Sequence, residues 1–140
     1  MSLNLPLILA YSQKNNVDFF SVVDARLETI RNFFKKRYDI IRHTKACTNP
    51  MAFMQGGFYK GNLKADDEIG DLVNYMTASF GVTALNELNI LGSGKTLYQD
   101  PWFAEVVLKH INDKVEQFKK EDGYLYAIYG TPKQVWARPE

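Results

Sequence analysis

One apolar stripe constrains the fold more than any other feature of the sequence. Large apolar side chains recur at steps of three and four between residues 19 and 41, and charged residues fill the positions between them. The stripe consists of Phe19, Phe20, Val23, Leu27, Ile30, Phe34, Tyr38 and Ile41. This is the period of an α-helix with one buried face. We therefore predict a helix of roughly six or seven turns, with Asn15 and Asn16 as candidate N-caps and Asp18 in the first turn.

The rest of the chain alternates short apolar runs with helical patterns. The predicted strands are Leu3–Tyr11, Asn74–Phe80, which ends at Gly81, and Tyr124–Tyr129. Further helices are predicted from Asp66, from Val82 to about Leu91 with Gly92 and Gly94 closing it, and from the Asp100-Pro101 pair to just before Gly123. Thr44 to Leu63 is predicted to be a long irregular connection. This order of elements indicates an α/β unit with helices outside a sheet.

Composition excludes several classes of function. The chain has 140 residues, of which 46% are hydrophobic and 24% charged, with a net charge of +1. This balance gives no electrostatic reason to expect nucleic acid or an anionic membrane as a partner. No apolar run approaches the roughly 18 residues of a membrane span, and the start does not resemble a signal peptide. A single cysteine, Cys47, excludes an internal disulfide and favours a cytoplasmic protein.

The segment Gly92-Ser93-Gly94-Lys95-Thr96 has part of the pattern of a phosphate-binding P-loop. The full pattern requires a glycine five residues before Gly94, where Asn89 stands, and it follows a strand rather than a helix. A solvated helix C-cap is the favoured interpretation.

His43, Cys47 and His110 lack the spacing of metal ligands. His110 lies in the apolar stripe of its predicted helix, which favours a core histidine over a catalytic base. No partner base is placed beside Cys47, so a buried or loop thiol is favoured over a nucleophile.

Four stretches, in this order, resemble the catalytic domain of the anaerobic, glycyl-radical ribonucleoside-triphosphate reductases. They are Asn4-Leu5-Pro6, the long helix with Pro50-Met51 and the Gly56-Gly57 loop after it, Ala78-Ser79-Phe80-Gly81-Val82 leading to Asn86-Glu87-Leu88, and Tyr124 to Pro132 with its Tyr129-Gly130-Thr131-Pro132 turn. The resemblance covers about residues 3 to 132. One departure is Leu7, which replaces the arginine that follows Asn-Leu-Pro in the family.

The resemblance implies that residues 1–140 are a single domain, a fragment of a ten-stranded α/β barrel whose strands line the active site. The family replaces the ribose 2′-hydroxyl of nucleoside triphosphates with hydrogen. It uses a glycyl radical installed by a radical-SAM iron–sulfur activase, a finger-loop cysteine and a zinc site. All three lie outside this region in the family, and Cys47 does not match the radical cysteine. We therefore expect no cofactor in this chain and no activity from it alone.

The resemblance also implies binding residues. Asn4 matches an asparagine beside the reacting ribose, where an amide can orient a hydroxyl without titrating; the alternative is an asparagine bonded to the backbone. Gly130-Thr131-Pro132 matches a turn before a helix whose N–H groups hold phosphates; the alternative is an ordinary turn. Gly81, expected between a strand end and a helix start, is either an anion-binding turn or a connection that needs a small residue.

Two hypotheses about partners remain open. In the first, the barrel is completed by the remaining segments of the reductase or by self-association, which would cover open sheet edges. In the second, the chain is a stand-alone, non-catalytic paralogue that acts through protein interactions. Under either hypothesis we expect weak binding of nucleoside triphosphate at most, and neither nucleic acid nor a membrane as a partner.

Overall fold

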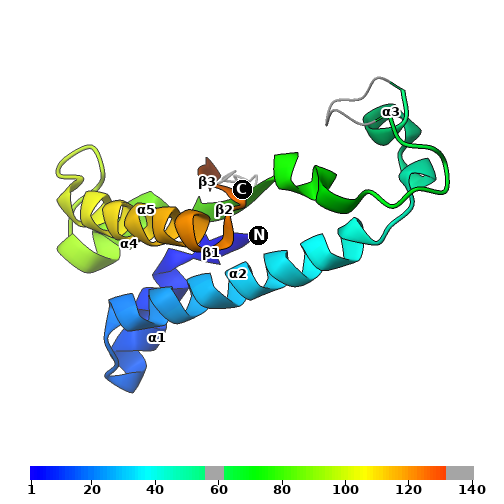
Figure 1. The fold of residues 1–140 in the computed structure, drawn as a ribbon. Coiled ribbons are helices and arrows are strands. Elements are labelled where there is room, and N and C mark those ends of the chain that lie inside the picture. The colour runs from blue at the N-terminus through cyan, green and yellow to red at the C-terminus, as the bar shows by residue number, and fades with distance from the viewer. Residues whose placement is uncertain (56–61, 132–140) are drawn as a thin grey trace, which may run out of the picture.

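Three parallel strands form one small sheet in a computed structural model that describes residues 1–55 and 62–131 (Figure 1). The strands, in the spatial order β1-β2-β3, are β1 (Ser2–Asn4), β2 (Thr77–Thr83) and β3 (Leu125–Thr131). The α-helices are α1 (Leu5–Asn15), α2 (Phe19–Arg42), α3 (Pro50–Phe53), α4 (Leu85–Ser93) and α5 (Trp102–Asp122), and the 3-10 helices are η1 (Ala46–Thr48) and η2 (Gly70–Tyr75). The predicted α/β class is confirmed.

The long helix predicted from the apolar stripe is confirmed as α2. Its buried side chains are Phe19, Val23, Leu27, Ile30, Phe34 and Tyr38. The predicted cap is wrong, because Asp18 rather than Asn15 or Asn16 caps the helix. An oxygen of its carboxylate accepts a hydrogen bond from the Ser21 N–H at 2.8 Å. Asn16 instead ends α1 in the left-handed conformation.

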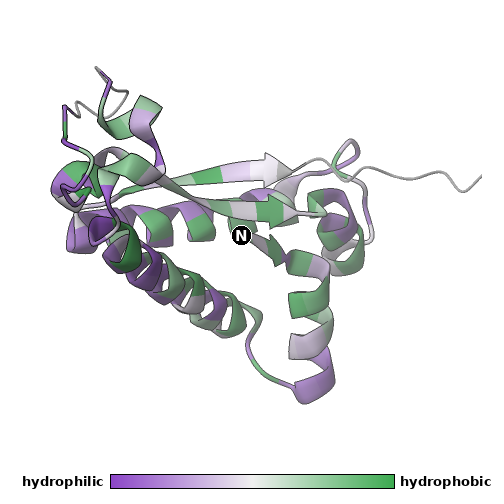
Figure 2. Ribbon diagram, turned by 90° about the vertical axis from the view of Figure 1, so that its right-hand side faces the viewer, coloured by the Kyte–Doolittle hydropathy of each residue, from purple (hydrophilic) through white to green (hydrophobic). Residues whose placement is uncertain are grey.

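The predicted strand over Leu3–Tyr11 is wrong beyond Asn4, where the chain turns into α1. Asn4 caps this helix and Pro6 lies in its first turn, a position where the missing N–H of proline costs nothing. The side chains buried from α1 are Leu5, Ile8, Leu9 and Ser12, which follow helical spacing. Figure 2 shows α1 and α2 together on one side of the strands.

The main core lies between the long helices and one face of the sheet. Ala78, Phe80 and Val82 alternate along β2 and are buried in this core. The Phe80 ring packs edge-on against Phe34 of α2, with ring centroids 5.2 Å apart, and lies 6.2 Å from Phe118 of α5. Alternate residues of β2 therefore point to the opposite face.

A second, smaller cluster lies beyond the end of α2, and Figure 1 shows α3 set apart from the sheet. Its buried members are Ala46, Ala52, Phe53, Ile69 and Val73. The region from Thr44, predicted to be irregular, thus contains η1 and α3. The helix predicted to begin at Asp66 is wrong, because Glu68 forms a bridge with Lys45 and regular structure resumes only at Gly70. The glycines of the Gly56-Gly57 loop lie outside the described residues.

Gly92 and Gly94 were both predicted to close helix α4, and only Gly94 does so. Gly94, with a positive φ of 76°, is the C-cap, as the sequence predicts, whereas Gly92 lies inside the helix. A Cβ at Gly92 would lie 2.2 Å from the Phe103 ring of α5, so the small residue is required by packing. In the described part of the chain, no helix is long and apolar enough to cross a membrane.

Candidate functional site at the carboxyl edge of the sheet

The register of the sheet brings two predicted binding elements to one edge. Asn4 at the end of β1 pairs with Thr83 of β2, and Thr83 pairs with Thr131 at the end of β3. Because all three strands are parallel, their carboxyl ends meet at this edge. Ligands of open α/β sheets bind outside the carboxyl ends of strands. Asn4 and Gly130-Thr131 are far apart in sequence but lie at the same edge, with only β2 between their strands. Pro132 lies outside the described residues.

Only the oxygen of the Asn4 side-chain amide takes part in capping α1. Its Oδ1 accepts a hydrogen bond from the Leu7 N–H at 3.2 Å, which is the backbone role that the sequence left open. Within residues 1–55 and 62–131, the Nδ2 group of Asn4 has no hydrogen-bond partner, and the residue is exposed. The amide thus keeps two donors for a ligand while its oxygen caps the helix.

Thr83 is an edge residue that sequence reasoning missed. Its hydroxyl donates a hydrogen bond to the carbonyl of Leu3 at 2.9 Å and so ties β1 to β2 beside Asn4. Ala84 follows with a positive φ of 59°, a conformation that L-residues adopt at a cost, and turns the chain into α4. In the sequence, small residues alternate with larger apolar ones at Thr77, Ser79, Gly81 and Thr83, and this alternation could have indicated that the strand continues to Thr83.

These alternate residues belong to the sheet face that the core does not cover. Ser2 and Thr77 are exposed on this face, and Ser79 and Thr83 are half-buried. Tyr129 of β3 is 41% exposed. Parallel sheets usually have both faces covered. An open face of small side chains and hydroxyls is therefore a surface that a ligand or further polypeptide can cover.

Gly81 does not lie in the predicted connection, because β2 continues two residues past it. Its N–H donates to the carbonyl of Met1 at 2.8 Å, so it is not available to an anion. A Cβ at Gly81 would lie 2.4 Å from the Ser2 Oγ and 2.9 Å from the Tyr129 ring. The Tyr129 and Ser2 hydroxyls lie 3.4 Å apart across this glycine. A small residue is needed here by the close approach of two side chains.

The remaining candidate residues lie away from the edge. His110 of α5 pairs with Asp24 of α2, with 2.7 Å between Nε2 and Oδ1, so it links two helices. Cys47 is exposed in η1. Lys95 pairs with Asp100 at 3.0 Å in the segment that had part of a P-loop pattern. Among the residues that the structure describes, no group of three potential ligands could hold a metal ion.

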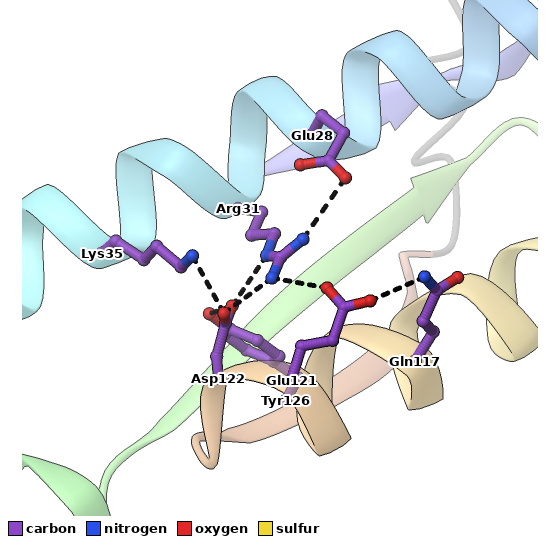
Figure 3. A network of polar contacts seen from close by, with 7 residues as sticks. All are labelled: Glu28, Arg31, Lys35, Gln117, Glu121, Asp122 and Tyr126. Carbon is purple, nitrogen blue, oxygen red and sulfur yellow. Dashed lines mark hydrogen bonds and ion pairs between the residues drawn. The ribbon is translucent and has the colours of Figure 1, made fainter.

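A charged cluster joins α2 to α5 (Figure 3). Arg31 contacts Asp122, Glu121 and Glu28, and Lys35 approaches Asp122 at 2.9 Å. Hydrogen bonds from Arg31 hold the pKa of Asp122 well below its ordinary value. Burial, followed by the hydrogen bond to Asp122, raises the pKa of Tyr126. The charges are mutually satisfied, which indicates a role in holding the helices together.

Comparison with known proteins decides the family. The model of the family described as "Anaerobic ribonucleoside-triphosphate reductase" matches residues 1–136. The chain belongs to this family. Family members of that name from Haemophilus influenzae and Salmonella typhimurium are 30% and 29% identical to it, each alignment covering 96% of this chain and 20% of the relative. The bacteriophage T4 member is 26% identical over 96% of this chain and 22% of the relative. The chain thus spans about a fifth of the length of these reductases.

Proposed function

We propose that this chain is an internal part of the catalytic barrel of an anaerobic ribonucleoside-triphosphate reductase. Its three parallel strands would be part of the ten-stranded α/β barrel, with the open face toward the substrate chamber. The activity of the whole protein would be the reduction of ribonucleoside triphosphates to deoxyribonucleoside triphosphates. When present, the glycyl radical supplies the unpaired electron for that chemistry. The residues of this chain bind and orient the substrate.

The observation that carries the proposal is the edge row of Asn4, Thr83 and Thr131. Adjacent strands lie about 4.8 Å apart, so the backbones at Asn4 and Thr131 are separated by roughly 10 Å. A ribose at one end of this row and its phosphates at the other can bridge that span. The free Nδ2 donors of Asn4 suit a sugar hydroxyl, and at the carboxyl end of β3 the N–H and the hydroxyl of Thr131 would be offered to the phosphates.

The open face of the sheet is compatible with a sugar bound near Asn4 and phosphates bound near Thr131. Ser79 and Thr83 have small side chains, so they leave room above the sheet for a sugar on either side of Gly81, where Ser2 and Tyr129 meet. No charged side chain belongs to the described strands β1, β2 and β3. A triphosphate would therefore be held by uncharged donors of the strands or by charges from outside the strands. We expect only weak binding by the isolated chain for this reason.

Calorimetry with ATP tests this expectation. The isolated chain should bind no tighter than about 1 mM, equivalent to roughly −4 kcal/mol. Micromolar binding that is lost in Thr131→Val would overturn the expectation that most of the site lies elsewhere. The chain should also form no deoxynucleotide when an iron–sulfur activase and formate are added, and any turnover would contradict its assignment as an incomplete part.

The coding sequence on both sides of this segment tests the assignment independently. An open frame that reaches a finger-loop cysteine upstream and a glycyl-radical motif downstream would support a part of a working reductase. Stop codons at both ends would contradict it and leave a stand-alone paralogue.

A further inference from the structure

The backbone edge of β2 is longer than the strand that covers it. All seven residues of β2 pair with β3, but only Gly81, Val82 and Thr83 pair with β1. In the described part of the protein, Thr77–Ser79 therefore have a strand neighbour on the β3 side only. Unpaired backbone groups at a sheet edge are a template for a further strand.

The orientation of these free groups follows from Gly81. Its N–H points toward β1, because it donates to the carbonyl of Met1. Successive residues of a strand point their backbone groups to opposite sides, so the N–H and C=O groups of Ser79 and Thr77 point the same way as those of Gly81. Two residues of β2 thus present donors and acceptors toward the space beside Met1.

A cavity of about 580 Å³ fills that space. Met1 closes one end of it, and Thr77, Ala78 and Ser79 form one wall. Its floor comes from α2, which contributes the apolar rings and chains of Phe34, Tyr38 and Ile41 and also Arg37. The cavity therefore combines an unpaired strand edge with a floor that is apolar apart from Arg37, which suits an added β-strand.

We propose that this cavity takes an extended polypeptide segment that continues β1 on the amino side of Met1 and pairs in parallel with Thr77–Ser79. Continuing the register of Ser2 with Gly81 places the first, second and third residues before Met1 opposite Ser79, Ala78 and Thr77. Relatives of this chain are about five times longer, so polypeptide is available to fill the position. A strand from a second copy fits less well, because it would have to stop where Met1 enters the sheet.

The register also sets the chemistry of the segment. The second residue before Met1 lies opposite Ala78 and shares its face, so its side chain packs onto Phe34, Tyr38 and Ile41 and must be apolar. Its carbonyl accepts from the Ser79 N–H, and its N–H donates to the Thr77 carbonyl. The first and third residues lie on the open face, where small polar side chains fit.

Hydrogen exchange on three versions of the chain tests this inference. One version is unextended, one carries Thr-Val-Thr before Met1, and the matched control carries Thr-Pro-Thr, whose proline is apolar but cannot donate to the Thr77 carbonyl. The Thr-Val-Thr extension should slow exchange of the Ser79 amide at least tenfold and raise the Tm by roughly 3 °C. The Thr-Pro-Thr extension should leave both near the unextended values.

Two results would overturn the inference. One is equal exchange of the Ser79 amide in the Thr-Val-Thr and Thr-Pro-Thr versions. The other is an unextended chain that sediments as a dimer with Ser79 already protected, since a second copy would then be the occupant. Neither result bears on nucleotide binding, which is measured separately.

Discussion

Arg31 and Asp122 form a bidentate ion pair that links the middle of α2 to the last residue of α5 (Figure 3). The Arg31 Nε lies 2.7 Å from Oδ2 and Nη2 lies 2.6 Å from Oδ1. The Asp122 side chain is only 6% exposed, and it also accepts a hydrogen bond from the Tyr126 hydroxyl at 2.9 Å. Partly buried pairs with this geometry are worth more than exposed ones.

Asp122→Asn should lower the free energy of unfolding at pH 7 by about 2 kcal/mol, because charge-assisted hydrogen bonds are lost. The folded pKa of Asp122 lies below its ordinary value. Its stabilising contribution is therefore complete above about pH 4, the pKa of an unfolded aspartate, and is lost as the pH falls toward the folded pKa. Urea unfolding of parent and variant between pH 7 and 2.5 should show their difference shrinking below about pH 4.

Glu116→Gln is the control for this prediction, because Glu116 and Lys119 form an exposed pair 3.5 Å apart. Its effect should stay below about 0.5 kcal/mol. A difference between parent and Asp122→Asn that stays constant at every pH would contradict the electrostatic role of the pair.

Asn89 is a fully buried polar residue that organises the connection between α4 and α5. Its Nδ2 donates to the carbonyls of Lys95 and Asp100, and its Oδ1 accepts from the Ala104 N–H at 3.0 Å. Asn89→Leu would leave three backbone groups unpaired and should destabilise the chain by about 3 kcal/mol in urea unfolding. The exposed Asn112→Ala should change stability by no more than about 0.5 kcal/mol. Equal effects of the two variants would mean that Asn89 is replaceable.

Gly92→Ala sets helix propensity against packing. Alanine is favoured over glycine inside a helix by about 1 kcal/mol. The new Cβ would nevertheless lie 2.2 Å from the Phe103 ring, which itself packs on Phe19. We expect a net loss of about 1 kcal/mol, because overpacking typically costs 1–3 kcal/mol. Thermal unfolding should also show the sign reverse in a Phe103→Leu background; a loss of the same size there would rule out the ring as the cause.

The sequence predicted the elements whose apolar period is long. Helix α2 was predictable because its stripe repeats over many turns, and the alternation of strands with helices indicated the class of the sheet. Helix α1 was missed because Pro6 and a short apolar run suggested a strand, although proline is common in the first turn of an α-helix. The role of Gly92 depends on Phe103 of the next helix, and how α4 packs on α5 is not visible in the local pattern around Gly92.

The candidate site was predictable only in part. Asn4, Thr131 and their neighbours were found through resemblance to a family, and their proximity required the strand register. Thr83 carries no motif and becomes relevant because it stands between them. Gly81 was placed in the wrong structural context, because a small residue between two apolar ones resembles a strand end as well as a strand interior.

Substrate kinetics of the reductase polypeptide of which this chain would form part test the central proposal most directly. Asn4→Ser keeps an oxygen that can cap α1 but removes the amide donors, so it separates the binding role from the helix cap. This variant should lower kcat/KM for a ribonucleoside triphosphate at least tenfold, a loss of about 1.4 kcal/mol, with an unchanged Tm. Thr131→Val should mainly raise KM, and the exposed Gln13→Ala should change neither constant. If Asn4→Ser and Thr131→Val both stay within about twofold of the parent, as Gln13→Ala should, the carboxyl edge of this sheet does not bind the substrate.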